Sequence, residues 1–149
     1  LVDILRDGVR VAWGKLVYIV VHMESRRILR PAAVEAFWNN PRPLSVSEPL
    51  RKIKAPEEMR ELGSTVIRLR DCDLNGHFSS HHYADVVCEA VGYWEESPRL
   101  MQSLQIDFTS ELRPGEELSV YTCTEGETRF VRGIKQDGIT AFTAECVMS

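Results

Sequence analysis

One amphipathic helix, followed by a series of short strand-like segments, is the pattern that most limits how this chain can fold. Through residues 83–94, apolar side chains recur three and four positions apart, which places them on one stripe of a helix. The stripe consists of Tyr83, Val86, Val87, Ala90, Val91 and Trp94. Ser79 or Ser80 is a suitable N-cap for this helix, and Pro98 lies just past its end. The sequence therefore predicts a helix that covers an apolar surface supplied by other elements.

Strand-like segments on both sides of this helix supply that surface. One precedes the helix and four follow it, at residues 65–70, 104–109, 118–124, 128–135 and 139–148. Turns at Pro114-Gly115 and Asp137-Gly138 join later segments and favour antiparallel neighbours. The order predicts an α+β domain in which a long helix packs against an antiparallel sheet of about five strands. A hot-dog fold has this order, although other two-layer α+β topologies share it.

The first part of the chain has a different character. Asp7-Gly8 lies between two strand-like runs and predicts a hairpin, because both central residues of a type I′ turn need positive φ. Residues 16–21 are continuously apolar, aromatic or β-branched, which favours a strand buried on both faces. Residues 32–38 are predicted to form a short helix. Repeated prolines make residues 39–63 an expected extended linker, with one helical turn as an alternative at 57–62.

Composition excludes several classes of function. The net charge is −4 and basic residues are interspersed with acidic ones, so we expect no nucleic-acid or membrane partner. The longest apolar run, residues 16–21, is too short to span a bilayer, and the first residues do not resemble a signal peptide. The chain has four cysteines, with no C-x-x-C pair or zinc-like spacing among them. We therefore expect reduced thiols, no metal, no cofactor and a cytoplasmic location.

The residues that point to chemistry lie just before the helix. Asp73, Asn75 and His77 occupy alternate positions. In an extended loop, alternate side chains point the same way, so the three are expected to face one cavity at the helix N-terminus. The unpaired N–H groups and positive dipole end of a helix can hold a thioester carbonyl and its developing oxyanion. The alternative is an ordinary polar turn, because Asp, Asn and Gly are common turn residues.

The pattern Asp-x-Asp-x-Asn-x-His over residues 71–77 is followed by a polar stretch, a Tyr and the amphipathic helix. It resembles the signature that opens the C-terminal, catalytic hot-dog half of acyl-acyl-carrier-protein (acyl-ACP) thioesterases. In that family, the strand after the helix runs into a Glu, which plant members follow with Cys. Glu111 matches this Glu, and Leu112 replaces the Cys. Ser79 and Ser80 replace the family's usual Asn residues.

The resemblance implies the second half of a double hot-dog. Residues 64–149 would be a complete catalytic-type domain, residues 39–63 a linker, and residues 1–38 the C-terminal remnant of a first, truncated hot-dog domain. The first half helps to form the acyl pocket in this family, so its truncation would affect chain-length choice. Hot-dog domains usually pair sheets side by side, so a homodimer is an expected substitute for the missing half.

The activity implied by the resemblance is hydrolysis of fatty acyl-ACP thioesters to free fatty acid, a step of fatty acid metabolism, with acyl carrier protein as partner. Glu111 would be base or nucleophile, and His77 would orient the water or carbonyl and handle a proton. Asn75 would position substrate or water, and Asp73 would orient Asn75 and His77 or share the base role. Without the Cys, a carboxylate mechanism is favoured. The alternatives are an acyl-CoA thioesterase and a non-catalytic acyl-binding or dimerisation module.

Overall fold

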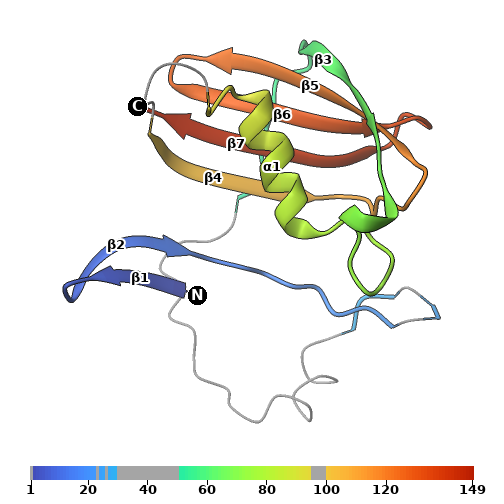
Figure 1. Ribbon diagram of the computed structural model, residues 1–149, viewed down its shortest axis with the longest axis horizontal. Helices are drawn as coiled ribbons and strands as arrows, with labels where there is room; N and C mark the ends of the chain where they lie inside the picture. The colour runs from blue at the N-terminus through green and yellow to red at the C-terminus, as the bar shows by residue number, and fades with distance from the viewer. Residues whose placement is uncertain (1, 23, 26, 30–50, 95–99) are drawn as a thin grey trace. The chain divides into compact units, whose positions relative to one another are not determined.

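The computed structural model describes residues 2–22, 24–25, 27–29, 51–94 and 100–149, which belong to two compact units (Figure 1). The first unit is Leu1–Leu50 and the second is Arg51–Ser149. Within the described ranges, no helix has the length and apolar character needed to cross a membrane. The predicted helix at residues 32–38 lies outside the described residues.

The described part of the first unit contains a β-hairpin. Strands β1 (Val2–Arg6) and β2 (Val9–Gly14) pair antiparallel. Asp7 has φ 51° and Gly8 has φ 78°, the two positive values that a type I′ turn requires. The predicted hairpin is therefore confirmed.

The predicted buried strand at residues 16–21 is wrong. Residues 15–20 of the described chain lie outside any strand, and Val21 forms an isolated bridge with Ile28. The segment is also exposed; Tyr18, for example, is 76% exposed. A β-branched, aromatic composition suits a sheet surface, but a strand also needs neighbours to pair with its backbone. In the described part of its unit, the segment makes only short backbone pairing near its end, where the Leu29 N–H donates to the Val20 carbonyl at 2.8 Å. The apolar run alone could not show how little of it is paired.

The second unit is a two-layer α+β domain. Its antiparallel sheet has five strands in the order β3-β5-β6-β7-β4. The strands are β3 (Arg60–Val66), β4 (Met101–Phe108), β5 (Glu117–Glu125), β6 (Thr128–Lys135) and β7 (Thr140–Met148). Helix α1 (Ser80–Ala90) crosses one face of this sheet, as Figure 1 shows. This arrangement confirms the predicted α+β, hot-dog fold.

The core lies between α1 and the sheet. The predicted helix stripe provides Tyr83, Val87 and Val91, all at most 4% exposed. They pack in one cluster with sheet residues that include Leu118, Val131, Phe142 and Ala144. Burial of each large apolar side chain stabilises a fold by roughly 1.5–3 kcal/mol, so this cluster fixes how α1 sits on the sheet.

Trp94 does not continue the helix stripe. Helix α1 ends at Ala90, and Gly92 adopts φ 65°, the left-handed conformation that commonly follows a helix. Trp94 therefore lies beyond the helix and is 78% exposed. The three-and-four spacing at the end of the stripe was coincidental.

The first strand of the sheet starts earlier than predicted. Strand β3 covers Arg60–Val66 instead of residues 65–70, and Leu69–Asp71 forms a 3-10 turn. The alternative helical turn at 57–62 is wrong as well, since its last three residues lie in β3. The strand contains a bulge at Gly63, where φ is 151° and the register with β5 shifts. That glycine interrupts the period-two pattern from which a strand is recognised.

Residues 51–56, within the predicted linker, pack against the sheet of the second unit. Ile53 is 6% exposed, and its N–H donates to Asp107 Oδ2 on β4 at 2.9 Å. Arg132 on β6 donates to the carbonyl of Pro56 at 2.9 Å. This part of the segment lacks regular structure, as expected, but it belongs to the compact unit. The assignment of residues 1–38 to a first hot-dog domain stays a prediction.

Candidate active site

The polar motif before α1 forms a closed turn. Asp73 Oδ1 accepts hydrogen bonds from the N–H groups of Asn75 at 2.8 Å and His77 at 3.1 Å. The Asp73 N–H donates to the His77 carbonyl at 2.8 Å, and Gly76 N–H donates to the Asp73 carbonyl at 3.0 Å. Gly76 has φ 73°, a conformation that glycine adopts without strain. The turn is thus closed by the Asp73 carboxylate and by the backbone together.

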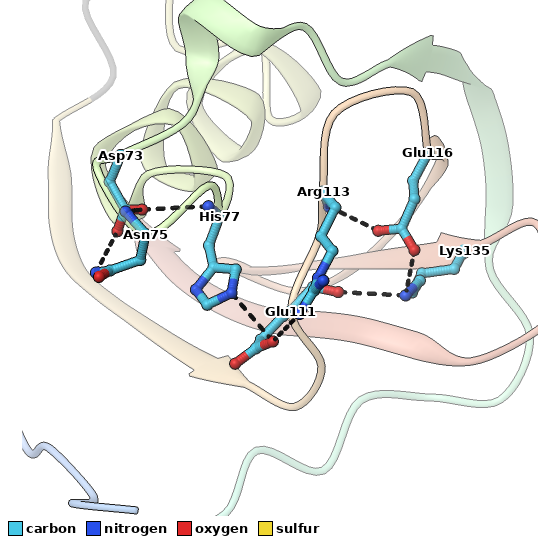
Figure 2. A network of polar contacts seen from close by, with 7 residues as sticks. All are labelled: Asp73, Asn75, His77, Glu111, Arg113, Glu116 and Lys135. Carbon is cyan, nitrogen blue, oxygen red and sulfur yellow. Dashed lines mark hydrogen bonds and ion pairs between the residues drawn. The ribbon is translucent and has the colours of Figure 1, made fainter. Parts of the chain in front are cut away.

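This geometry corrects the expectation of an extended loop. Asp73 and Asn75 are exposed and lie beside each other, with Asn75 Nδ2 3.5 Å from Asp73 Oδ2. The His77 ring extends in another direction, toward Glu111, as Figure 2 shows. The three motif side chains therefore do not line one cavity together. Asp73 shapes the turn, and His77 is the one motif residue of the three whose side chain lies against Glu111.

His77 and Glu111 form the central pair of the site. His77 Nε2 lies 3.2 Å from Glu111 Oε2, and the two side chains are 25% and 44% exposed. A backbone hydrogen bond from Phe78 to the Leu112 carbonyl, 2.8 Å long, connects the motif turn to the segment after β4. The sequence places these two segments far apart, and the fold brings an imidazole and a carboxylate within hydrogen-bonding distance.

No activated thiol is present at this pair in the described structure. Leu112, which the sequence analysis compared with a Cys, is fully buried. Tyr83 packs beside Leu112. Burial raises the pKa of Tyr83 to about 12, although a hydrogen bond with the Leu112 backbone lowers it in part. The nearby Cys72 also has a raised pKa, owing to burial and the negative charges of Asp71 and Asp73. A thiol with a raised pKa is protonated at neutral pH and is a poor nucleophile.

Three charged residues extend the site beyond the pair. Arg113 Nη2 lies 3.5 Å from Glu111 Oε2. Glu116 accepts the Arg113 N–H at 2.6 Å and pairs with Lys135 Nζ at 2.8 Å. Lys135 also donates to the Glu111 carbonyl at 3.2 Å (Figure 2). None of these three residues was assigned to the site in the sequence analysis. Among the described residues, no group of three His, Cys, Asp or Glu side chains is arranged to hold a metal ion.

The turn-closing role of Asp73 predicts a pH-dependent stability. Hydrogen bonds from the His77 and Asn75 backbones lower the pKa of Asp73 below its ordinary value of 3.8. A lowered folded-state pKa stabilises the fold above the unfolded-state value, and the contribution is lost as pH falls through the folded-state pKa. Asp73→Ala should therefore lower the melting temperature by a few degrees at pH 7, with a smaller difference from the parent near pH 3. Thermal unfolding followed by circular dichroism at both pH values measures this.

Asp85→Ala is the matched control, because Asp85 is an exposed carboxylate within α1. Its effect should be smaller at pH 7. An Asp73→Ala protein that melts with the parent at pH 7 would contradict the assigned role of this carboxylate in closing the turn.

Comparison with known proteins agrees with this fold. The family model of the acyl-ACP thioesterase C-terminal domain matches residues 53–141. Among curated proteins, none matches the sequence significantly. A solved acyl-ACP thioesterase from Bacteroides thetaiotaomicron shares 16% identity at a TM-score of 0.66, over 87% of this chain and 53% of that one. The 12:0-ACP thioesterase from Umbellularia californica shares 16% identity at 0.63, over 87% and 52%.

A third solved structure shares the fold. Protein SAV2348 from Staphylococcus aureus, solved in complex with CoA, shares 19% identity at a TM-score of 0.55, over 62% of this chain and 77% of that one. At such identities the structural likeness establishes the fold alone. The chain spans about half the length of the two solved acyl-ACP thioesterases. Because the family model matches more than half of its residues, the chain belongs to the acyl-ACP thioesterase family, with the C-terminal domain of that family at residues 53–141.

Proposed function

We propose that this chain hydrolyses fatty acyl-ACP thioesters and releases free fatty acid. The observation that carries the proposal is the contact between His77 Nε2 and Glu111 Oε2 at 3.2 Å, within a domain of the acyl-ACP thioesterase family. An imidazole beside a carboxylate, both partly exposed, can activate water next to a bound thioester. Such a pair suits hydrolysis better than acyl binding, which needs no proton acceptor.

Glu111 is the better of the two candidate carboxylates for the base. Both Asp73 oxygens face groups of the motif turn, and hydrogen bonds from His77 and Asn75 lower its pKa. A carboxylate stabilised in its charged form accepts a proton weakly. Asp73 is therefore proposed as a positioning residue. Glu111, held by longer contacts from His77 and Arg113, is proposed as the proton acceptor.

In the proposed reaction, Glu111 accepts a proton from water as the water oxygen bonds to the thioester carbon. The tetrahedral intermediate then breaks its C–S bond, and the phosphopantetheine sulfur leaves as a thiolate. His77 carries the proton from Glu111 to that sulfur, so that acid and thiol are released and the pair returns to its starting state. Asn75 is proposed to position the substrate or the water.

The start of α1 is proposed to stabilise the oxyanion. The helix begins at Ser80, three residues after His77, and the Ser79 side chain makes no capping hydrogen bond to the described helix. The first N–H groups of a helix are left without intrahelical partners and carry partial positive charge. Donors of this kind stabilise the negative charge that develops on a carbonyl oxygen during acyl transfer.

Release of free thiol from matched substrates tests the proposal. The purified chain would be assayed with acyl-ACP and acyl-CoA carrying the same acyl group, over several acyl lengths. We expect turnover on acyl-ACP with kcat/KM at least about tenfold above that on acyl-CoA, a difference of about 1.4 kcal/mol in transition-state binding. Spontaneous hydrolysis is measured without protein and subtracted, and the His77→Ala variant is assayed in parallel.

Each other outcome of this assay supports a different function. Faster turnover of acyl-CoA would contradict acyl-ACP as the preferred substrate and favour an acyl-CoA thioesterase. The structurally similar protein solved with CoA makes this a specific alternative. Binding of acyl-ACP without thiol release would contradict hydrolysis and favour an acyl-binding module. A homodimer through the hot-dog sheets is a separate proposal, and a monomeric mass by light scattering would contradict it.

A further inference from the structure

We propose that the ion pair between Glu116 and Lys135 is a positioning device that holds Glu111 against His77. The inference rests on the proposed function, because it assigns a role in placing the proposed base. Neither residue reaches His77 itself; both act through the chain that carries Glu111. They are positioning residues, and not catalytic ones.

The segment that carries Glu111 is a connection between two strands that neighbouring elements hold in place. Strand β4 ends at Phe108 and β5 begins at Glu117, so residues 109–116 form the connection between them. Glu111 therefore lies outside the sheet ladder that fixes a strand residue. On one side, the Thr109 and Ser110 N–H groups donate to the Ala141 carbonyl at 2.8 Å and 3.1 Å. The Phe78 N–H donates to the Leu112 carbonyl at 2.8 Å.

The ion pair holds the same segment from the other side. Lys135 Nζ lies 2.8 Å from Glu116 Oε1 and 3.2 Å from the Glu111 carbonyl oxygen. Glu116 Oε2 accepts the Arg113 N–H at 2.6 Å. One ammonium and one carboxylate thus bind the backbone both at Glu111 and two residues later, as Figure 2 shows.

The anchor of this device is a residue of the sheet. Lys135 lies at the end of β6, where its Cα pairs with that of Leu118 on β5 and its N–H donates to the Ile139 carbonyl at 2.9 Å. The side chains of Lys135 and Glu116 are 13% and 33% exposed, so solvent screens this pair less than an exposed one. Burial raises the pKa of Glu116, but hydrogen bonds from Lys135 and Arg113 outweigh it and leave the pKa lowered, which keeps Glu116 charged at neutral pH.

Loss of the pair should loosen both contacts of the Glu111 carboxylate. Without Lys135, the Glu111 carbonyl loses its donor, and without Glu116, the Arg113 backbone loses its acceptor. Arg113 Nη2 and His77 Nε2 both approach Glu111 Oε2, at 3.5 Å and 3.2 Å, so a shift of the segment disturbs the two together. A misplacement of about 1 Å in a catalytic group can lower a rate by as much as about 10²-fold.

The first measurement reads the position of Glu111 without any substrate. The ¹⁵N chemical shift of His77 Nε2 is recorded at fixed pH in the parent chain, Lys135→Met and Glu116→Gln. Glu111→Gln defines the shift expected when the carboxylate is lost. Both variants should move the His77 resonance at least a third of the way toward that reference. Lys54→Met, which removes an exposed lysine in the segment that precedes β3, should leave it in place.

The second measurement is steady-state kinetics on the best thioester substrate. Lys135→Met and Glu116→Gln should each lower kcat about tenfold with KM changed by less than about twofold, because placement of the base affects the transition state more than substrate binding. The double variant should be no slower than the slower single variant, since both changes remove one device. Lys135→Arg keeps a donor for both acceptors and should restore at least half of kcat, which general destabilisation would not explain.

The two measurements separate failure of this inference from failure of the proposed function. An unmoved His77 resonance in folded Lys135→Met and Glu116→Gln overturns the positioning role, whatever the kinetics. If Lys135→Met does not fold, Glu116→Gln, which preserves shape, decides alone. A parent chain that releases no thiol overturns the proposed function, while the chemical shifts still test whether the ion pair places Glu111. Additive kinetic losses in the double variant would also count against a single device.

Discussion

Glu111→Gln is expected to lower kcat for thioester hydrolysis by about 10²–10⁴-fold, the range for loss of a general base. Glutamine keeps the shape of the side chain but cannot accept a proton from water. Glu111 is 44% exposed, so the substitution should leave the melting temperature within about two degrees of the parent. Thiol release under saturating substrate, together with thermal unfolding of the same preparation, measures both effects.

The control for this prediction is Glu125→Gln. Glu125 is an exposed carboxylate at the far end of β5 from the site, so the parent rate should be retained. His77→Ala should resemble Glu111→Gln, and the double variant should be little slower than either, because members of one catalytic pair are strongly non-additive. If Glu111→Gln retains more than about a tenth of kcat, the proton acceptor lies elsewhere, and Asp73 becomes the carboxylate to test.

Much of the second unit was predictable because its signals are local. Residues 128–135 were predicted as a strand before the turn at Asp137-Gly138, and the observed β6 has those bounds. Helix α1 begins at Ser80, directly after Ser79, one of the two predicted caps, and Tyr83 and Val87 of its stripe are buried. Strand β3 was misplaced because the bulge at Gly63 breaks the alternation from within. Residues 16–21 were misassigned because apolar composition does not show whether a pairing partner is present.

The residues of the candidate site could be predicted from the sequence, but their arrangement in space could not. The spacing of Asp73, Asn75 and His77, together with Glu111 after the next strand, identified the segments that meet. The extended-loop argument failed because Asp73 bonds to the backbone of Asn75 and His77, which folds the segment into a turn. Local hydrogen bonds of this kind compete with extended structure. Alternation of residue types in the sequence does not show whether the segment forms a turn or stays extended.

The support around Glu111 could not be predicted from the sequence. Lys135 reaches Glu116 and Glu111 because the β5–β6 register places it opposite Leu118, two residues after Glu116. A change of one residue in that register would turn the lysine to the other face of the sheet. The ion pair between Lys135 and Glu116 therefore depends on strand pairing. The sequence alone does not indicate that these two residues meet.

Gly133→Ala is expected to destabilise the second unit by about 3 kcal/mol or more, through overpacking of a full core. Gly133 lies within β6 and is buried, and a Cβ there would overlap the ring of Phe142 and contact Leu118 Cδ1 at 2.8 Å. Both neighbours are fully buried, so neither can move into solvent. For a domain of this size, the melting temperature should fall by more than about 10 °C.

Two further variants separate crowding at Gly133 from a general intolerance of alanine in strands. Gly14→Ala in β2 adds the same methyl group where no described heavy atom lies within 4 Å, and it should be nearly neutral. Phe142→Leu makes room beside Gly133, so Gly133→Ala should cost less in that background than in the parent, a coupling visible in a double-mutant cycle. A Gly133→Ala protein that melts within two degrees of the parent would mean that β6 and β7 can separate locally at this position. The close approach of Gly133 to Phe142 would then not be what fixes the packing of the sheet beneath α1.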